Sequence, residues 1–147
     1  MPSMIRVVVA EDDPGLRELF CEQLGVAPDF EVIGEARSGR EALDYLFGTG
    51  AYAGRDVTTP PQVVLLDLKL PKISGLEVLK RIRDDARTRM QPVVILTSST
   101  EEQDLAAGYG LGANSYIRKP VDFDHFSEAA RQIGLYWLVL NEAPPRG

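Results

Sequence analysis

Side chains able to bind a metal or accept a phosphoryl group follow four short apolar runs, each at the carboxyl end of its run. In chain order they are Glu11-Asp12-Asp13, Asp67, Thr97-Ser98 and Lys119-Pro120. In an open α/β sheet, ligands bind at the carboxyl ends of the strands. If these runs are neighbouring parallel strands, the carboxylates, a hydroxyl and an ammonium group converge on one edge.

The carboxylates define the chemistry that we expect at this edge. Crowded carboxylates repel one another and need a counter-charge. A hard divalent cation supplies it, and Mg²⁺ typically takes one or two carboxylates together with waters and phosphate oxygens. Asp67 can then act as a nucleophile toward a phosphoryl group. Lys119 and Thr97 can hold the phosphoryl oxygens that the metal does not bind.

The acidic triplet after the first run has two interpretations. Asp13 precedes Pro14, which is typical of a helix N-cap followed by proline at the first helical position. This favours Glu11 and Asp12 as the metal pair, while Asp12 and Asp13 remain an alternative. Any one of these acids alone could be an ordinary solvated charge. A functional site is favoured because polar residues stand at the ends of four predicted strands together.

Five apolar runs bounded by turn signals are predicted to be strands. They cover residues 5–10, 31–36, 63–66, 93–97 and 115–117. The first, third and fourth are β-branched and apolar on both faces. Such runs are typical of a parallel sheet that helices cover on both sides.

Helical patterns fill the gaps between these runs. The first apolar helix face would carry Leu16, Leu19, Phe20 and Leu24. A second helix is predicted after Ser38, with Glu41 completing a capping box. A third is marked by Leu76, Leu79 and Ile82, a fourth covers 101–108, and a fifth covers 122–140. The alternation predicts an α/β fold with a doubly wound, five-stranded parallel sheet and five helices. Residues 48–62 are expected to form an exposed loop.

Length and charge narrow the class of protein. The chain has 147 residues, and 16 basic against 22 acidic residues give a formal net charge of −6. This length fits one domain, and the acidic balance argues against nucleic-acid binding. No apolar run approaches a membrane span, and the first residues do not resemble a signal peptide. The single Cys21 excludes an intramolecular disulfide. We therefore expect a soluble, cytoplasmic protein with no membrane partner.

Four stretches of the sequence carry a family pattern. They are Val7-Val8-Val9-Ala10-Glu11-Asp12-Asp13, Leu65-Leu66-Asp67-Leu68-Lys69-Leu70-Pro71, Ile95-Leu96-Thr97-Ser98 and Tyr116-Ile117-Arg118-Lys119-Pro120. In this order and spacing they resemble the receiver domain of two-component response regulators, over about residues 4–140. The resemblance implies the flavodoxin-like strand order 2-1-3-4-5. It also implies a receiver domain over residues 1–142, a flexible tail over 143–147 and no output domain.

The resemblance assigns a role to each matching residue. It implies that Asp67 is the phosphoacceptor and that Glu11 and Asp12 position Mg²⁺, with Asp12 the more direct ligand. The backbone carbonyl of Lys69 would complete the metal shell, while its side chain either affects phosphate lifetime, as Ser99 would, or points to solvent.

The remaining matching residues would stabilise and report the phosphoryl group. Thr97 and Tyr116 resemble the switch hydroxyl and the switch aromatic residue of the family. Lys119 resembles its phosphate-pairing lysine, with a cis bond to Pro120.

The end of the last predicted helix is apolar on every face. Leu135, Tyr136, Trp137 and Leu138 lie in this segment, and a helix of this kind needs more than one partner surface. We predict a homodimer through this segment, with wrapping by the chain's own tail as the alternative. The ending also resembles stand-alone receivers associated with bacterial phytochromes, which implies a sensor histidine kinase as partner.

The leading hypothesis is a phosphoacceptor signalling protein, which is not an enzyme in the turnover sense. It would signal through the face of its last helix, or pass phosphate to a histidine phosphotransfer protein. An aspartate-nucleophile phosphohydrolase is disfavoured, because Lys69 stands where a second acid is usual. A flavin-binding module is disfavoured, because Glu11-Asp12-Asp13 would repel phosphate. A structural dimer with a silent site is disfavoured by the intact acid set and Lys119.

Overall fold

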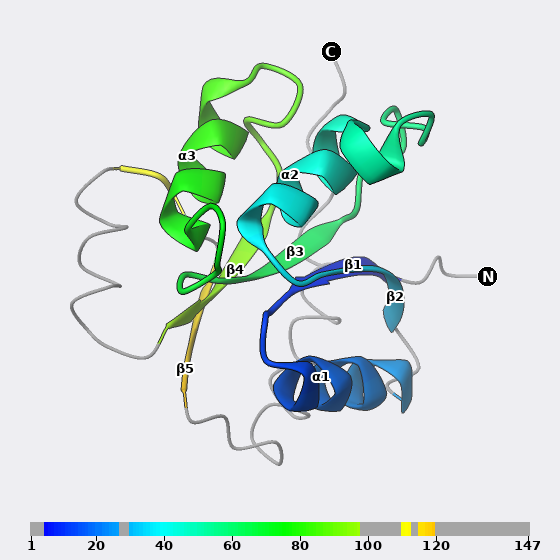
Figure 1. Cartoon of the computed structure of the whole chain (residues 1–147), viewed down its shortest axis with the longest axis vertical. Helices are drawn as coiled ribbons and strands as arrows, with labels where there is room; N and C mark the ends of the chain where they lie inside the picture. Colours follow the sequence, from blue (N-terminus) through cyan, green and yellow to red (C-terminus); the bar gives the residue numbers. More distant parts are fainter. Residues whose placement is uncertain (1–4, 27–29, 98–109, 113–114, 120–147) are drawn as a thin grey trace.

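The computed structural model describes residues 5–26, 30–97, 110–112 and 115–119, and it centres on a parallel sheet (Figure 1). The strands are β1 (Ile5–Ala10), β2 (Phe30–Ala36), β3 (Val63–Asp67), β4 (Val93–Thr97) and β5 (Ser115–Arg118). All four neighbouring pairs are parallel, and the order across the sheet is β2-β1-β3-β4-β5. The predicted topology is confirmed.

Helices lie on both faces of this sheet. Helix α1 (Pro14–Val26) covers one face, and α2 (Gly39–Phe47) and α3 (Gly75–Asp84) cover the other (Figure 1). The loop predicted over 48–62 is mostly exposed and contains one short 3-10 helix, η1 (Gly50–Tyr52). The helices predicted over 101–108 and 122–140, Pro120 and the dimer segment 135–138 lie outside the described residues.

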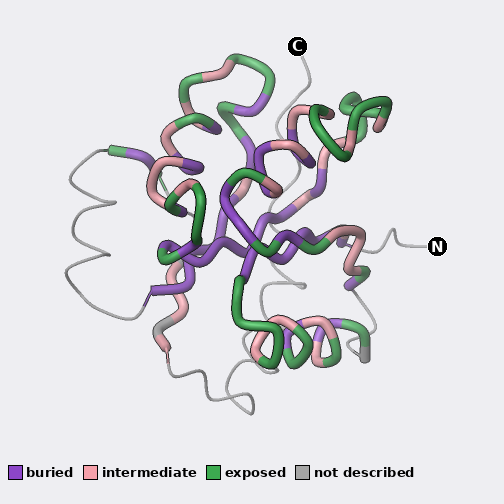
Figure 2. The backbone as a smooth tube through the Cα atoms, in the orientation of Figure 1, coloured by how far each residue is buried: buried purple, intermediate pink, exposed green. Residues whose placement is uncertain are grey.

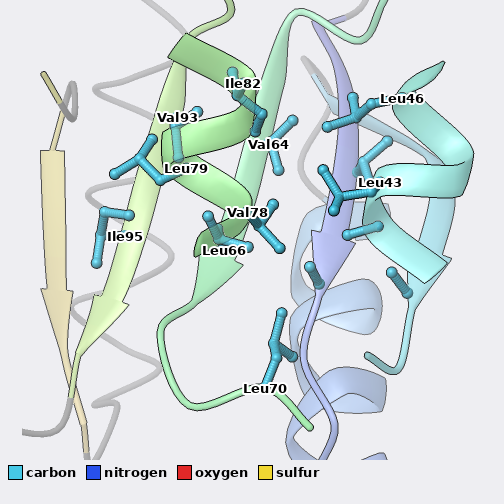
Figure 3. Close-up of a cluster of buried hydrophobic side chains, with 14 of the residues drawn as sticks. Leu43, Leu46, Val64, Leu66, Leu70, Val78, Leu79, Ile82, Val93 and Ile95 are labelled. Carbon is cyan, nitrogen blue, oxygen red and sulfur yellow. The ribbon is translucent and has the colours of Figure 1, made fainter. Parts of the chain in front are cut away.

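The core consists of two clusters, one on each side of the sheet. Val8 and Ala10 of β1 pack into the cluster under α2 and α3, which Figure 3 shows with its leucine, isoleucine and valine side chains interleaved. Ile5, Val7 and Val9 point to the other side and pack with α1. Because both faces are covered, the central strands are buried along their length (Figure 2), which explains their unbroken apolar runs.

The predicted start of α1 is confirmed, but its predicted apolar face is partly wrong. The Oδ1 of Asp13 accepts hydrogen bonds from the amides of Gly15 (2.9 Å) and Leu16 (3.2 Å), so Asp13 caps the helix ahead of Pro14. Leu19, however, is 43% exposed. At about 100° per residue it lies about 140° round the helix from Leu24, outside the arc that faces the sheet.

Serine caps fix the starts of α2 and α3. The Ser38 Oγ accepts a hydrogen bond from the Glu41 amide at 3.1 Å, as predicted. In the same way the Ser74 Oγ accepts one from the Glu77 amide at 3.2 Å. Both helices therefore begin at the carboxyl edge of the sheet, beside the strand ends that carry the polar residues.

Candidate functional site

The polar strand ends meet at the carboxyl edge of the sheet. Glu11 directly follows β1, Asp67 and Thr97 are the last residues of β3 and β4, and Lys119 follows β5. The Lys119 amide donates to the Thr97 carbonyl at 2.8 Å, which extends the β4–β5 ladder beyond β5. The parallel register thus carries four residues that are far apart in sequence to one place.

Three carboxylates gather at this edge. One carboxylate oxygen from each of Glu11, Asp12 and Asp67 lies within 4.8 Å of the other two. Glu11 is fully buried, Asp67 is 2% exposed and Asp12 is exposed. The Asp13 carboxylate is engaged at the start of α1 instead. Of the two alternative acid pairs, the geometry therefore favours Glu11 with Asp12.

Lys119 bridges the two buried acids. Its Nζ lies 2.7 Å from Oε1 of Glu11 and 2.7 Å from Oδ2 of Asp67. The other Asp67 oxygen, Oδ1, accepts a hydrogen bond from the Lys69 amide at 3.0 Å. Asp67 therefore has each carboxylate oxygen held by a different donor, which fixes the plane of its carboxylate.

The pKa values of the two buried acids shift in opposite directions. Burial, together with its hydrogen bond to Asp67, raises the pKa of Glu11 to about 8. Burial also opposes ionisation of Asp67, but hydrogen bonds from Glu11, Lys119 and the Lys69 amide outweigh it and lower the pKa of Asp67. Burial disfavours the charged Lys119, yet its bonds to both acids raise its pKa. Burial therefore disfavours the charged form of Glu11, whereas the donors around Asp67 favour the charged form of that residue.

The oxygen set fits a hard divalent cation. The buried Oε1 of Glu11 makes no hydrogen bond of good geometry within the described residues, and its contact there is the charge of Lys119. Three carboxylates with no nitrogen or sulfur ligand among them suit Mg²⁺ or a similar ion.

Thr97 and Tyr116 lie on neighbouring strands, two residues apart in the register. Tyr116 pairs with Ile95, and Thr97 follows Ile95 by two residues, so the two side chains belong to the same face. Thr97 is buried, and Tyr116 is half-buried against the cluster under α2 and α3. Lys69 is exposed.

Sequence analysis missed two residues that shape this edge. A Cβ on Gly75 would lie 2.1 Å from the Asp67 carbonyl oxygen, so only glycine lets α3 begin this close to β3. Arg17 of α1 donates from Nη1 to the Glu11 carbonyl at 2.9 Å. The glycine after a serine cap was visible in the sequence, but nothing in the sequence pattern pointed to Arg17.

Comparison with known proteins identifies the family. A family model described as response regulator receiver domain matches residues 7–131. The chain belongs to this family. Its members are signalling proteins, not classical enzymes, which sensor histidine kinases phosphorylate and which bind a divalent metal in an acidic pocket.

Individual relatives cover most of the chain. The probable methanogenesis regulatory protein FilR2 of Methanothrix harundinacea is 42% identical over 84% of this chain and 75% of its own length. The bacteriophytochrome response regulator AtBRR is 46% identical, with a TM-score of 0.76 over 96% of this chain and 100% of its own. The Mn²⁺-bound form of response regulator Rcp1 is 32% identical, with a TM-score of 0.77 over 95% and 99%. The chain spans only 49% to 58% of several other curated relatives.

Within the described residues, no helix is both long and apolar enough to cross a membrane.

Proposed function

We propose that this receiver domain accepts a phosphoryl group on Asp67 from a sensor histidine kinase, in a reaction that depends on Mg²⁺. The observation that carries the proposal is the pairing of a buried, ionised Asp67 with Lys119 inside a group of three carboxylates. A buried carboxylate needs a partner of opposite charge. Here one cation serves two buried acids and a third acid lies beside them.

Each residue of the edge has a distinct part in the transfer. Glu11, Asp12 and Asp67 would hold the metal together with the Lys69 carbonyl, and the ion would neutralise charge on the incoming phosphoryl oxygens. A carboxylate oxygen of Asp67 attacks phosphorus as the bond from phosphorus to the donor nitrogen breaks. Lys119, already 2.7 Å from Oδ2 of Asp67, is placed to pair with a phosphoryl oxygen. The domain supplies this catalysis itself, both for its phosphorylation and for its dephosphorylation.

The output rests on residues beside the acceptor. Thr97 would turn its hydroxyl toward the new phosphoryl group, and Tyr116 would follow on the same face of the sheet. The signal would then leave through the surface that includes β5. We propose that the protein acts in the cytoplasm as a homodimer through Leu135, Tyr136, Trp137 and Leu138. A phytochrome-type kinase is the proposed partner, because the bacteriophytochrome response regulator AtBRR and the cyanobacterial phytochrome response regulator RcpA are among the structural neighbours.

The phosphoacceptor assignment is tested with a small-molecule donor. The full chain is incubated with Mg²⁺ and acetyl phosphate, and mass spectrometry follows the addition of one phosphoryl group. Wild type and the control Asp84→Asn, which changes an exposed carboxylate of α3, should be modified equally. Asp67→Asn should not be modified. Equal modification of Asp67→Asn and wild type would place the acceptor elsewhere.

A further inference from the structure

The peptide bond that joins Glu11 to Asp12 is held from both sides. On one side, its carbonyl oxygen accepts a hydrogen bond from Nη1 of Arg17 at 2.9 Å. On the other, its N–H, which belongs to Asp12, donates to Oε2 of Glu11 at 3.0 Å. Rotation of this peptide would break both bonds, so the relative orientation of the two acidic side chains depends on them.

Arg17 is itself fixed by a neighbouring strand. Its side chain is only 11% exposed, and its Nε lies 3.3 Å from Oε1 of Glu35 on β2. On the same strand, the Ala36 carbonyl accepts a hydrogen bond from the Glu11 amide at 2.9 Å. One guanidinium group therefore joins the first turn of α1, the end of β2 and the acidic loop, and its planar fork allows both contacts at once.

We propose that Arg17 is a positioning residue for the metal site, acting through the Glu11–Asp12 peptide. The proposal rests on the metal-dependent function of the preceding section. Within the described residues, Arg17 contacts the backbone carbonyl of Glu11 and the carboxylate of Glu35, and it contacts no carboxylate of the metal group. Groups that orient metal ligands from the next shell typically affect metal affinity by about 10- to 100-fold when they are lost.

The sign of the effect separates positioning from simple electrostatics. Arg17 is a cation near a cation site, so its charge alone opposes metal binding, and its removal would tighten binding. Loss of positioning has the opposite result, because Glu11 and Asp12 would have to be ordered by the metal itself. A weaker metal site in a variant that has lost a nearby positive charge is therefore specific to positioning.

The experiment measures Mg²⁺ binding to the full chain by calorimetry. We expect Arg17→Ala to bind Mg²⁺ about tenfold more weakly than wild type. Arg17→Lys should recover part of the affinity, because an ammonium group can donate to the Glu11 carbonyl but cannot also hold Glu35 in the same geometry. The control Arg81→Ala removes an exposed arginine that pairs with Glu77 on α3, and its affinity should equal that of wild type.

A measurement without metal gives an independent result. The Asp12 amide, bonded to Oε2 of Glu11, should exchange its hydrogen more slowly in wild type and Arg81→Ala than in Arg17→Ala. Should Arg17→Ala fail to fold, Glu35→Ala leaves the carbonyl contact but frees the guanidinium group, and should weaken binding a few-fold.

The outcomes distinguish the positioning role of Arg17 from the proposed metal-dependent function. Mg²⁺ binding by Arg17→Ala that equals or exceeds wild type, with an unchanged Asp12 exchange rate, overturns the positioning role alone. Absence of Mg²⁺ binding in wild type overturns the metal site and the positioning role with it.

Discussion

Two partly buried cations at opposite ends of the sheet have different kinds of partner. At the carboxyl end, Lys119 faces the carboxylates of Glu11 and Asp67. At the amino ends of β4 and β5, the Arg83 side chain has only backbone carbonyls as hydrogen-bond acceptors among the residues that the structure describes. Its partners are the carbonyl oxygens of Leu111 (2.6 Å), Gln91 (2.7 Å), Gly112 (2.8 Å) and Arg89 (3.1 Å).

The partners decide what each cation can do. Carbonyl oxygens do not titrate, so the arrangement around Arg83 has one charge state, even though burial lowers the pKa of that arginine. The carboxylates around Lys119 change charge when they lose a proton, bind a metal or accept a phosphoryl group. Arg83 therefore ties helix α3 to two loops, one before β4 and one before β5, whereas Lys119 lies where a change of charge can become a signal.

The largest expected effect comes from removing the cation that faces carboxylates. Lys119→Gln removes the ammonium group that would pair with the phosphoryl oxygens, and phosphorylation by acetyl phosphate should slow by about 100-fold. The same change removes a cation that competes for the acids, so Mg²⁺ affinity should rise. Lys72→Gln, on the exposed turn after β3, should change neither quantity. A normal phosphorylation rate in Lys119→Gln would contradict its role.

The carbonyl side of the comparison should respond in stability alone. Arg83→Ala leaves four carbonyl groups without their charged donor, and we expect the free energy of unfolding to fall by about 3 kcal/mol. Denaturant titration measures this loss. Phosphorylation of the folded fraction should be unchanged, because Arg83 makes its bonds at the other end of the sheet. A tenfold slower phosphorylation would show that the two ends are coupled.

A pair of glycines tests how closely the backbone must approach the acceptor. Gly75→Ala places a Cβ 2.1 Å from the Asp67 carbonyl oxygen, so the backbone must shift, and we expect a stability loss of about 2 kcal/mol with slower phosphorylation. Gly25→Ala on α1 meets no atom within 4 Å, and it should stabilise the helix by about 0.5 kcal/mol. Equal stability of the two variants in thermal melts would contradict the close approach.

Sequence analysis succeeded where local pattern and topology determine the outcome. The parallel arrangement of the strands follows from alternating strands and helices, whereas the strand order came from the family resemblance. Parallel strands carry Glu11, Asp67 and Lys119 to one edge of the sheet. The caps at Asp13 and Ser38 depend only on neighbouring residues.

Sequence analysis failed where a contact depends on the path of the backbone between two elements. Arg17 with the Glu11 carbonyl, Gly75 with the Asp67 backbone and Arg83 with the Leu111 carbonyl are contacts that no spacing rule contains. The roles of individual site residues, the last helix and its dimer segment stay predictions.

A pH dependence also separates the two cations. In the metal-free protein the pKa of Glu11 is raised to about 8 from 4.5, so the folded state binds more protons than the unfolded state between these values. This contribution to stability is complete below about pH 4.5 and is lost as the pH rises through about 8. We expect the free energy of unfolding of the metal-free wild type to fall as the pH rises from 5 to 8. Glu11→Gln should lack this component, whereas Arg83→Ala should retain it, since carbonyl partners do not titrate.

Unfolding by denaturant at several pH values, in the presence of a chelator, measures the difference. The same pH profile in wild type and Glu11→Gln would contradict the raised pKa of Glu11.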